Sequence, residues 1–142
     1  MNFESCIKEG KAKKIPIDKV VAKSLITSSK QAIETANNIP ITESSLKSIL
    51  RELYEGLREY CEAIIYLHGY KILDHISITC FLRDILKDEN LSVKFDRYRK
   101  LRNGVNYYGA DLNVETVHEA LIEIPKLIKG LEKYKLKQLL VK

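Results

Sequence analysis

Apolar residues recur at steps of three and four along most of the chain, the spacing that places them on one face of an α-helix. The clearest pattern covers residues 46–67. Comparable patterns cover residues 17–36, 76–85, 95–105 and 114–131. No stretch alternates with a period of two for long enough to predict a strand. The hydrophobic pattern therefore predicts an all-α protein.

Helix-capping residues and helix breakers divide these patterns into separate helices. Ser, Thr, Asp and Asn cap helix starts, proline suits the first turn, and glycine ends helices. The predicted starts lie at Pro16, Thr42, Asp74, Asn90 or Ser92, and Asn113, while Gly69 ends the helix of residues 43–67. The small side chains of Ser28, Ala32 and Ala36 would let another helix approach closely.

Short connections make successive helices antiparallel neighbours. We therefore predict an up-and-down bundle of four main helices with additional short helices. A chain of 142 residues forms one domain and buries a substantial core. The predicted domain is residues 1–142, with its core at about 16–136.

Charge and cysteine content limit the possible partners and the cellular compartment of the protein. The net charge of +5 permits an anionic partner such as nucleic acid. Cys6, Cys61 and Cys80 form no CxxC pair, which fits buried thiols in a reducing cytoplasm. The longest apolar run, residues 63–67, is too short to span a bilayer. We expect a cytoplasmic protein without a membrane partner.

The sequence lacks the common signatures of metal, cofactor and triad chemistry. The three histidines are scattered and form no HxxxH or HExxH pair, and no GxxxxGK[ST] or GxGxxG loop is present. We therefore expect no metal and no cofactor. Asp74 and His75 are adjacent and could form an acid–imidazole pair, but a helix-capping role for Asp74 is the preferred interpretation.

Arg102 is the residue that the helical pattern does not explain. Phe95, Tyr98 and Val105 share one apolar face, and Arg102 lies one turn beyond Tyr98 on that same face. A guanidinium on the inward side of a helix needs a partner or a cleft, because an unpaired buried charge is costly. Arg99 lies at the edge of this face.

Two interpretations of Arg102 remain open from the residues alone. In the first, it forms a polar cluster that binds the phosphates and bases of RNA or a nucleotide. The members of this cluster are Arg99, Arg102, Asn103, Asn106, Tyr107 and Tyr108. In the second, Arg102 is a structural residue that pairs with a carboxylate of a neighbouring helix, such as Glu59 or Glu62.

Two stretches resemble the HEPN family, the higher eukaryote and prokaryote nucleotide-binding domains. The family motif is Arg, a polar residue, and then His after four to six intervening positions; Arg102 and Asn103 match its first part. The second stretch runs from Ala63–Leu67 through Gly69-Tyr70-Lys71 to His75 and the apolar Ile78, Phe81 and Leu82. The resemblance covers about residues 43–131.

The resemblance implies a small, dimeric helical bundle that binds RNA or a nucleotide, in some members as the toxin beside a minimal nucleotidyltransferase antitoxin. It also implies a metal-independent endoribonuclease, but Tyr107 or Tyr108 stands where the motif has His. Tyrosine is a poor general base at neutral pH. We therefore predict a binding module, with Arg102 and Tyr107 as catalytic residues in the endoribonuclease alternative, and a structural interaction bundle as the second alternative.

Overall fold

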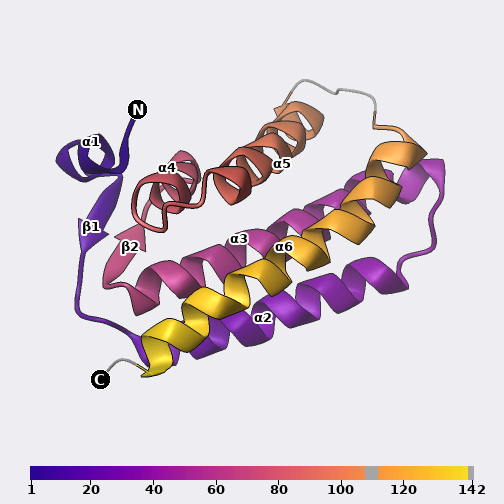
Figure 1. Ribbon diagram of the computed structural model, residues 1–142. Helices are drawn as coiled ribbons and strands as arrows, with labels where there is room; N and C mark the ends of the chain where they lie inside the picture. Colours follow the sequence, from indigo (N-terminus) through magenta and orange to yellow (C-terminus); the bar gives the residue numbers. More distant parts are fainter. Residues whose placement is uncertain (108–111, 141–142) are drawn as a thin grey trace.

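The computed structural model describes residues 1–107 and 112–140, with the backbone alone for residues 105–107 and 136–140. The described elements are α1 (Phe3–Lys8), β1 (Ala12–Lys14), α2 (Lys19–Asn38), the 3₁₀ turn η1 (Glu43–Ser45), α3 (Leu46–Leu67), β2 (Tyr70–Ile72), α4 (Ile76–Asp84), α5 (Glu89–Tyr107) and α6 (Val114–Leu140). Figure 1 shows a helical bundle, which confirms the predicted all-α class.

Helix α3 is the centre of the bundle. It contacts α2 along its length and also contacts α4, α5 and α6. Buried side chains therefore occur nearly all around it, including Leu50, Leu53, Leu57 and Ile64. Because α3 touches both α4 and α5, it can bring residues from these two helices together around one side chain.

Helices α2 and α3 approach closely through small residues, as the sequence predicts. Ala32 and Ala36 of α2 are buried, and the Ser29 hydroxyl donates a hydrogen bond of 2.6 Å to the carbonyl oxygen of Gly56 in α3. A Cβ atom at position 56 would lie 3.1 Å from the Ser29 carbonyl oxygen of α2, tighter than an ordinary contact. The helix–helix contact therefore depends on glycine at this position.

The prediction that the chain has no strand is wrong for two short segments. β1 and β2 pair antiparallel, with Ala12 opposite Ile72 and Lys14 opposite Tyr70. Each strand has three residues, too few for a period of two to be recognised in the sequence. This small sheet connects the N-terminal segment to the end of α3.

The predicted start of α2 at Pro16 is also wrong. The helix begins at Lys19, and Asp18 caps it by accepting a hydrogen bond of 3.0 Å from the Val21 backbone N–H. The Ile15 N–H instead donates to the carbonyl oxygen of Gly69 at 2.9 Å. This bond prolongs the extended pairing of β1 and β2, so the helix starts three residues later than expected.

The capping residues predicted for the later helices are confirmed in part. Neither Asn90 nor Ser92 caps α5, because Asp88 accepts a hydrogen bond of 3.1 Å from the Leu91 N–H. Asn113 caps α6 as predicted, with a bond of 2.8 Å from the Thr116 N–H. Gly69 ends α3 with a φ of 82°, a backbone conformation that favours glycine.

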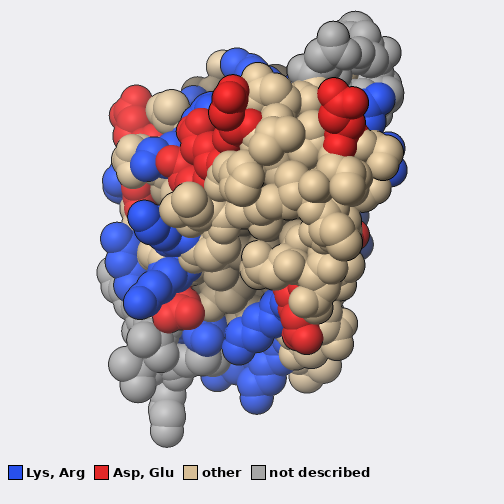
Figure 2. All heavy atoms as spheres, turned by 90° about the vertical axis from the view of Figure 1, so that its right-hand side faces the viewer, with Lys and Arg blue, Asp and Glu red and all other residues tan. Residues whose placement is uncertain are grey.

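The surface at the end of the bundle where α2 passes into α3 is largely uncharged (Figure 2). Lys, Arg, Asp and Glu side chains lie mainly around the margins of this view. Within the described ranges, no helix combines the length and the apolar character that crossing a membrane would require.

Candidate anion-binding site

Arg102 lies on the inner side of α5, as its spacing predicts. Phe95 and Tyr98 on the same face are fully buried, and Arg102 is half-buried. Its guanidinium carbon lies 5.8 Å from the centroid of the Tyr54 ring of α3, within the range of a cation–π contact. The aromatic face orients the guanidinium without neutralising its charge.

The carboxylates expected to pair with Arg102 have other partners. Glu62 and Glu55 both accept hydrogen bonds from Arg58, within α3 itself. Glu59 is buried against α2, where it accepts a hydrogen bond from Ser28. Across residues 1–107 and 112–140, no carboxylate lies within ion-pair distance of Arg102.

Arg99 differs from Arg102 because its charge is already paired. Its Nε donates a hydrogen bond of 2.8 Å to Asp96, one turn earlier on α5. The Asp96 carboxylate also accepts a bond of 3.0 Å from the Thr79 hydroxyl of α4 and lies 3.1 Å from the Lys100 ammonium. Arg99 therefore helps to join α4 to α5, while Arg102 keeps an uncompensated charge within the described part.

Tyr54 and His75 form a hydrogen-bonded pair beside Arg102. The Tyr54 hydroxyl lies 2.9 Å from Nδ1 of His75, the residue that precedes α4. Burial raises the pKa of Tyr54, so its hydroxyl keeps its proton at neutral pH. Burial, and then the guanidinium groups of Arg58 and Arg102, lower the pKa of His75, which favours the neutral imidazole.

The hydrogen bond fixes which ring nitrogen of His75 is available to a ligand. In the part of the chain that the structure describes, His75 is the sole partner of the Tyr54 hydroxyl, which is fully buried. The hydroxyl proton is therefore donated to Nδ1, and the proton of the neutral imidazole lies on Nε2. His75 is half-buried, so its Nε2–H can donate to a bound anion.

Sequence reasoning did not identify Tyr54 or its contact with His75. Tyr54 lies in the apolar pattern of residues 46–67, where an inward tyrosine is typical of the hydrophobic core.

The preference for Asp74 as a cap is confirmed, because Asp74 accepts hydrogen bonds from the Ser77 N–H at 3.1 Å and from the Ser77 hydroxyl at 2.5 Å. Asp74 thereby holds the start of α4, where His75 lies.

We expect Asp74→Ala to lower the free energy of unfolding by about 1 kcal/mol, the usual cost of losing an N-terminal cap. Asp74→Asn retains an oxygen acceptor and should stay within about 0.5 kcal/mol of the wild type. Urea denaturation followed by circular dichroism measures both values. Equal losses in the two variants would show that the charge of Asp74, and not its cap, stabilises α4.

The remaining candidates lie at the end of α5. Asn103 is half-buried next to Arg102. Asn106 and Tyr107 belong to the last turn of α5, but their side chains lie outside the described residues, as does Tyr108. The roles predicted for these three residues stay predictions.

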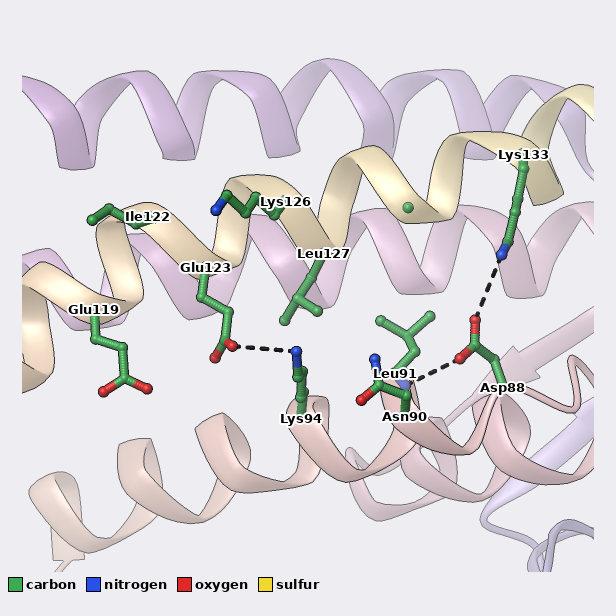
Figure 3. A pocket seen from close by; sticks show the side chains of 11 residues that line it. Asp88, Asn90, Leu91, Lys94, Glu119, Ile122, Glu123, Lys126, Leu127 and Lys133 are labelled. Atoms are coloured by element: carbon green, nitrogen blue, oxygen red, sulfur yellow. Dashed lines mark hydrogen bonds and ion pairs between the residues drawn. The ribbon is translucent and has the colours of Figure 1, made fainter.

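A groove of about 600 Å³ lies between α5 and α6, away from Arg102 (Figure 3). Its acidic side chains point to basic ones: Glu123 lies 3.4 Å from the Lys94 ammonium, and Asp88 lies 4.0 Å from that of Lys133. Glu123 also accepts a hydrogen bond of 2.6 Å from Tyr98. The charges of this groove thus compensate one another and tie α5 to α6, unlike the charge of Arg102.

Comparison with known proteins assigns the chain to no family. No protein-family model matches the chain, and neither a curated protein nor a solved structure matches it. Over the described residues, no group of three His, Cys, Asp or Glu side chains could hold a metal ion.

Proposed function

We propose that this protein is a HEPN-like helical domain that binds RNA or a nucleotide, with Arg102 as its main phosphate-binding residue. The observation that supports this most is the uncompensated charge of Arg102. Its guanidinium is half-buried against Tyr54, and no described carboxylate pairs with it. A guanidinium presents a planar set of donors that suits a phosphate group.

The proposal includes a homodimer in which two Arg102 segments line a shared cleft. A polar residue set in an apolar helix face suits an isologous interface, where each copy presents the same surface. By the HEPN resemblance, the protein acts as the toxin-type partner of a minimal nucleotidyltransferase. A metal-independent endoribonuclease that uses Arg102 and Tyr107 is the related alternative.

Binding of a fluorescently labelled uridine decamer tests the role of Arg102. We expect Arg102→Gln to weaken binding about tenfold or more, because a hydrogen bond to a charged group contributes about 1.5–3 kcal/mol. Arg97→Gln removes the same charge from an exposed position of α5 that is paired with Glu119 at 2.7 Å. Because an exposed ion pair contributes little, this control should change the affinity by less than about twofold. Fluorescence anisotropy at one fixed salt concentration measures both.

Equal affinities of the Arg102→Gln and Arg97→Gln variants would contradict this function, and so would an absence of binding by the wild type. The same decamer, with Tyr107→Phe as an additional variant, tests the endoribonuclease alternative. Cleavage of the decamer that persists in EDTA and is lost in Tyr107→Phe would favour an enzyme over a binding module. An intact decamer would exclude cleavage of this substrate.

A further inference from the structure

We propose that His75 and Arg102 together bind one phosphodiester group of single-stranded RNA, and that His75 takes up a proton when this group binds. The inference rests on the proposed function, which places a phosphate at Arg102. It adds a second binding residue from another helix and couples the binding to protonation. It also assigns a role to a histidine that lies outside the Arg102–Tyr107 motif.

The first support is that His75 and Arg102 approach the same aromatic ring. The His75 ring centroid lies 5.7 Å from the Tyr54 ring centroid, and the Arg102 guanidinium carbon lies 5.8 Å from it. Tyr54 also packs against Phe95 of α5, with 5.7 Å between ring centroids. The buried ring therefore holds α3, the start of α4 and the inner face of α5 in a fixed relation.

The second support is the set of donors that this arrangement leaves available. Nδ1 of His75 is occupied by the Tyr54 hydroxyl, and Nε2 makes no hydrogen bond to any residue in the described ranges. The Arg102 guanidinium likewise has no carboxylate partner there. A phosphodiester offers two anionic oxygens, so it can accept one hydrogen bond from each side chain.

The third support is the balance of charge around His75. From α3, Tyr54, Glu55 and Arg58 face it; Asp74 precedes it, and Arg102 faces it from α5. Burial and the positive charges of Arg58 and Arg102 oppose protonation of His75, while the carboxylates of Glu55 and Asp74 favour it. Arg58 is paired with Glu55 and Glu62, whereas Arg102 has no carboxylate partner in the described ranges.

A bound phosphodiester reverses this balance. Its negative charge offsets the charge of Arg102 and favours the imidazolium form, so the pKa of His75 rises on binding. The proton is taken up at Nδ1, so the bond to Tyr54 reverses and Nδ1–H donates to the Tyr54 hydroxyl oxygen. The protonated form must then bind RNA more tightly than the neutral form. Affinity is highest below the pKa of the free protein and falls as the pH rises through the pKa of the complex.

The pH dependence of uridine-decamer binding tests this coupling. Phosphodiesters and uridines keep the same charge over the range used, so the titrating groups belong to the protein. We expect the affinity to be about tenfold higher at about pH 5.5 than at about pH 8, because each unit by which binding raises a pKa contributes a factor of ten. A constant affinity over this range would overturn the proposal.

Two asparagine variants distinguish the contribution of His75 to the pH dependence from that of other titrating groups. His75→Asn can still accept a hydrogen bond from Tyr54 but has neither the Nε2 donor nor a proton to take up. It should bind the decamer about tenfold more weakly at low pH and lose the pH dependence. His118→Asn alters an exposed histidine of α6 and should retain the wild-type dependence. The same dependence in both variants would overturn the role of His75.

Nuclear magnetic resonance of the wild type gives a measurement that does not depend on how the variants fold. The imidazole signals of His75 should titrate below the ordinary histidine pKa in the free protein and move to higher pH with the decamer bound. If Arg102→Gln weakens binding but the titration of His75 is unmoved by RNA, this inference fails while the proposed function stands. If the decamer does not bind at all, both fail.

Discussion

Gly56→Val is expected to lower the free energy of unfolding by about 3 kcal/mol, a large value for overpacking at a helix–helix contact. A Cβ atom at position 56 would lie 2.7 Å from the Ile33 Cδ1 atom and 3.1 Å from the Ser29 carbonyl oxygen. Ile33 can rotate away, but the backbone of α2 cannot move without disturbing its neighbours. The two branches of valine would also disturb the bond from the Ser29 hydroxyl to the Gly56 carbonyl.

Gly130→Val supplies the matched control for this substitution. Gly130 also lies inside a helix, but a Cβ atom there meets nothing within 4 Å, and the position is exposed. Because valine is a better helix former than glycine, stability should be unchanged or rise by a few tenths of a kcal/mol, roughly. Chemical denaturation followed by circular dichroism measures both variants. Similar losses at positions 56 and 130 would mean that the close approach of α2 and α3 does not limit stability.

The helical pattern predicted the main helices because each buries one face over several turns. It did not reveal the pairing of β1 and β2, since three residues carry no recognisable period. The start of α2 was misplaced because Pro16 is locally suited to a helix start. The hydrogen bond between Ile15 and Gly69, residues far apart in the sequence, decides otherwise. Local propensity predicts a helix well but does not fix the end that a tertiary contact sets.

The candidate site was predictable only where one helix carries it. Arg102 was located from its spacing to Phe95 and Tyr98, because all three lie on α5. Its relation to Tyr54 and His75 depends on how α3, α4 and α5 meet, which no spacing within one helix encodes. The same limit applies to its partners: Glu62 was a reasonable candidate, but the structure pairs it with Arg58.

Tyr54→Ala is expected to lower the free energy of unfolding by about 3–5 kcal/mol, the range for removing a large buried aromatic side chain. Tyr54 is fully buried, and its ring contacts Phe95, His75 and Arg102. The variant removes the surface on which the guanidinium rests as well as the hydroxyl bonded to His75. Chemical denaturation of the folded protein measures the loss.

Two phenylalanine variants divide this loss between the ring and the hydroxyl. Tyr54→Phe keeps the ring and should cost about 1 kcal/mol, the net contribution of one hydrogen bond. Tyr60→Phe removes a buried hydroxyl that has no hydrogen-bond partner among the described residues, so it should cost less than about 0.5 kcal/mol. Equal costs at the two positions would show that the bond to His75 adds no stability. A cost at Tyr54 alone means that this bond holds His75 and α3 together before any ligand binds.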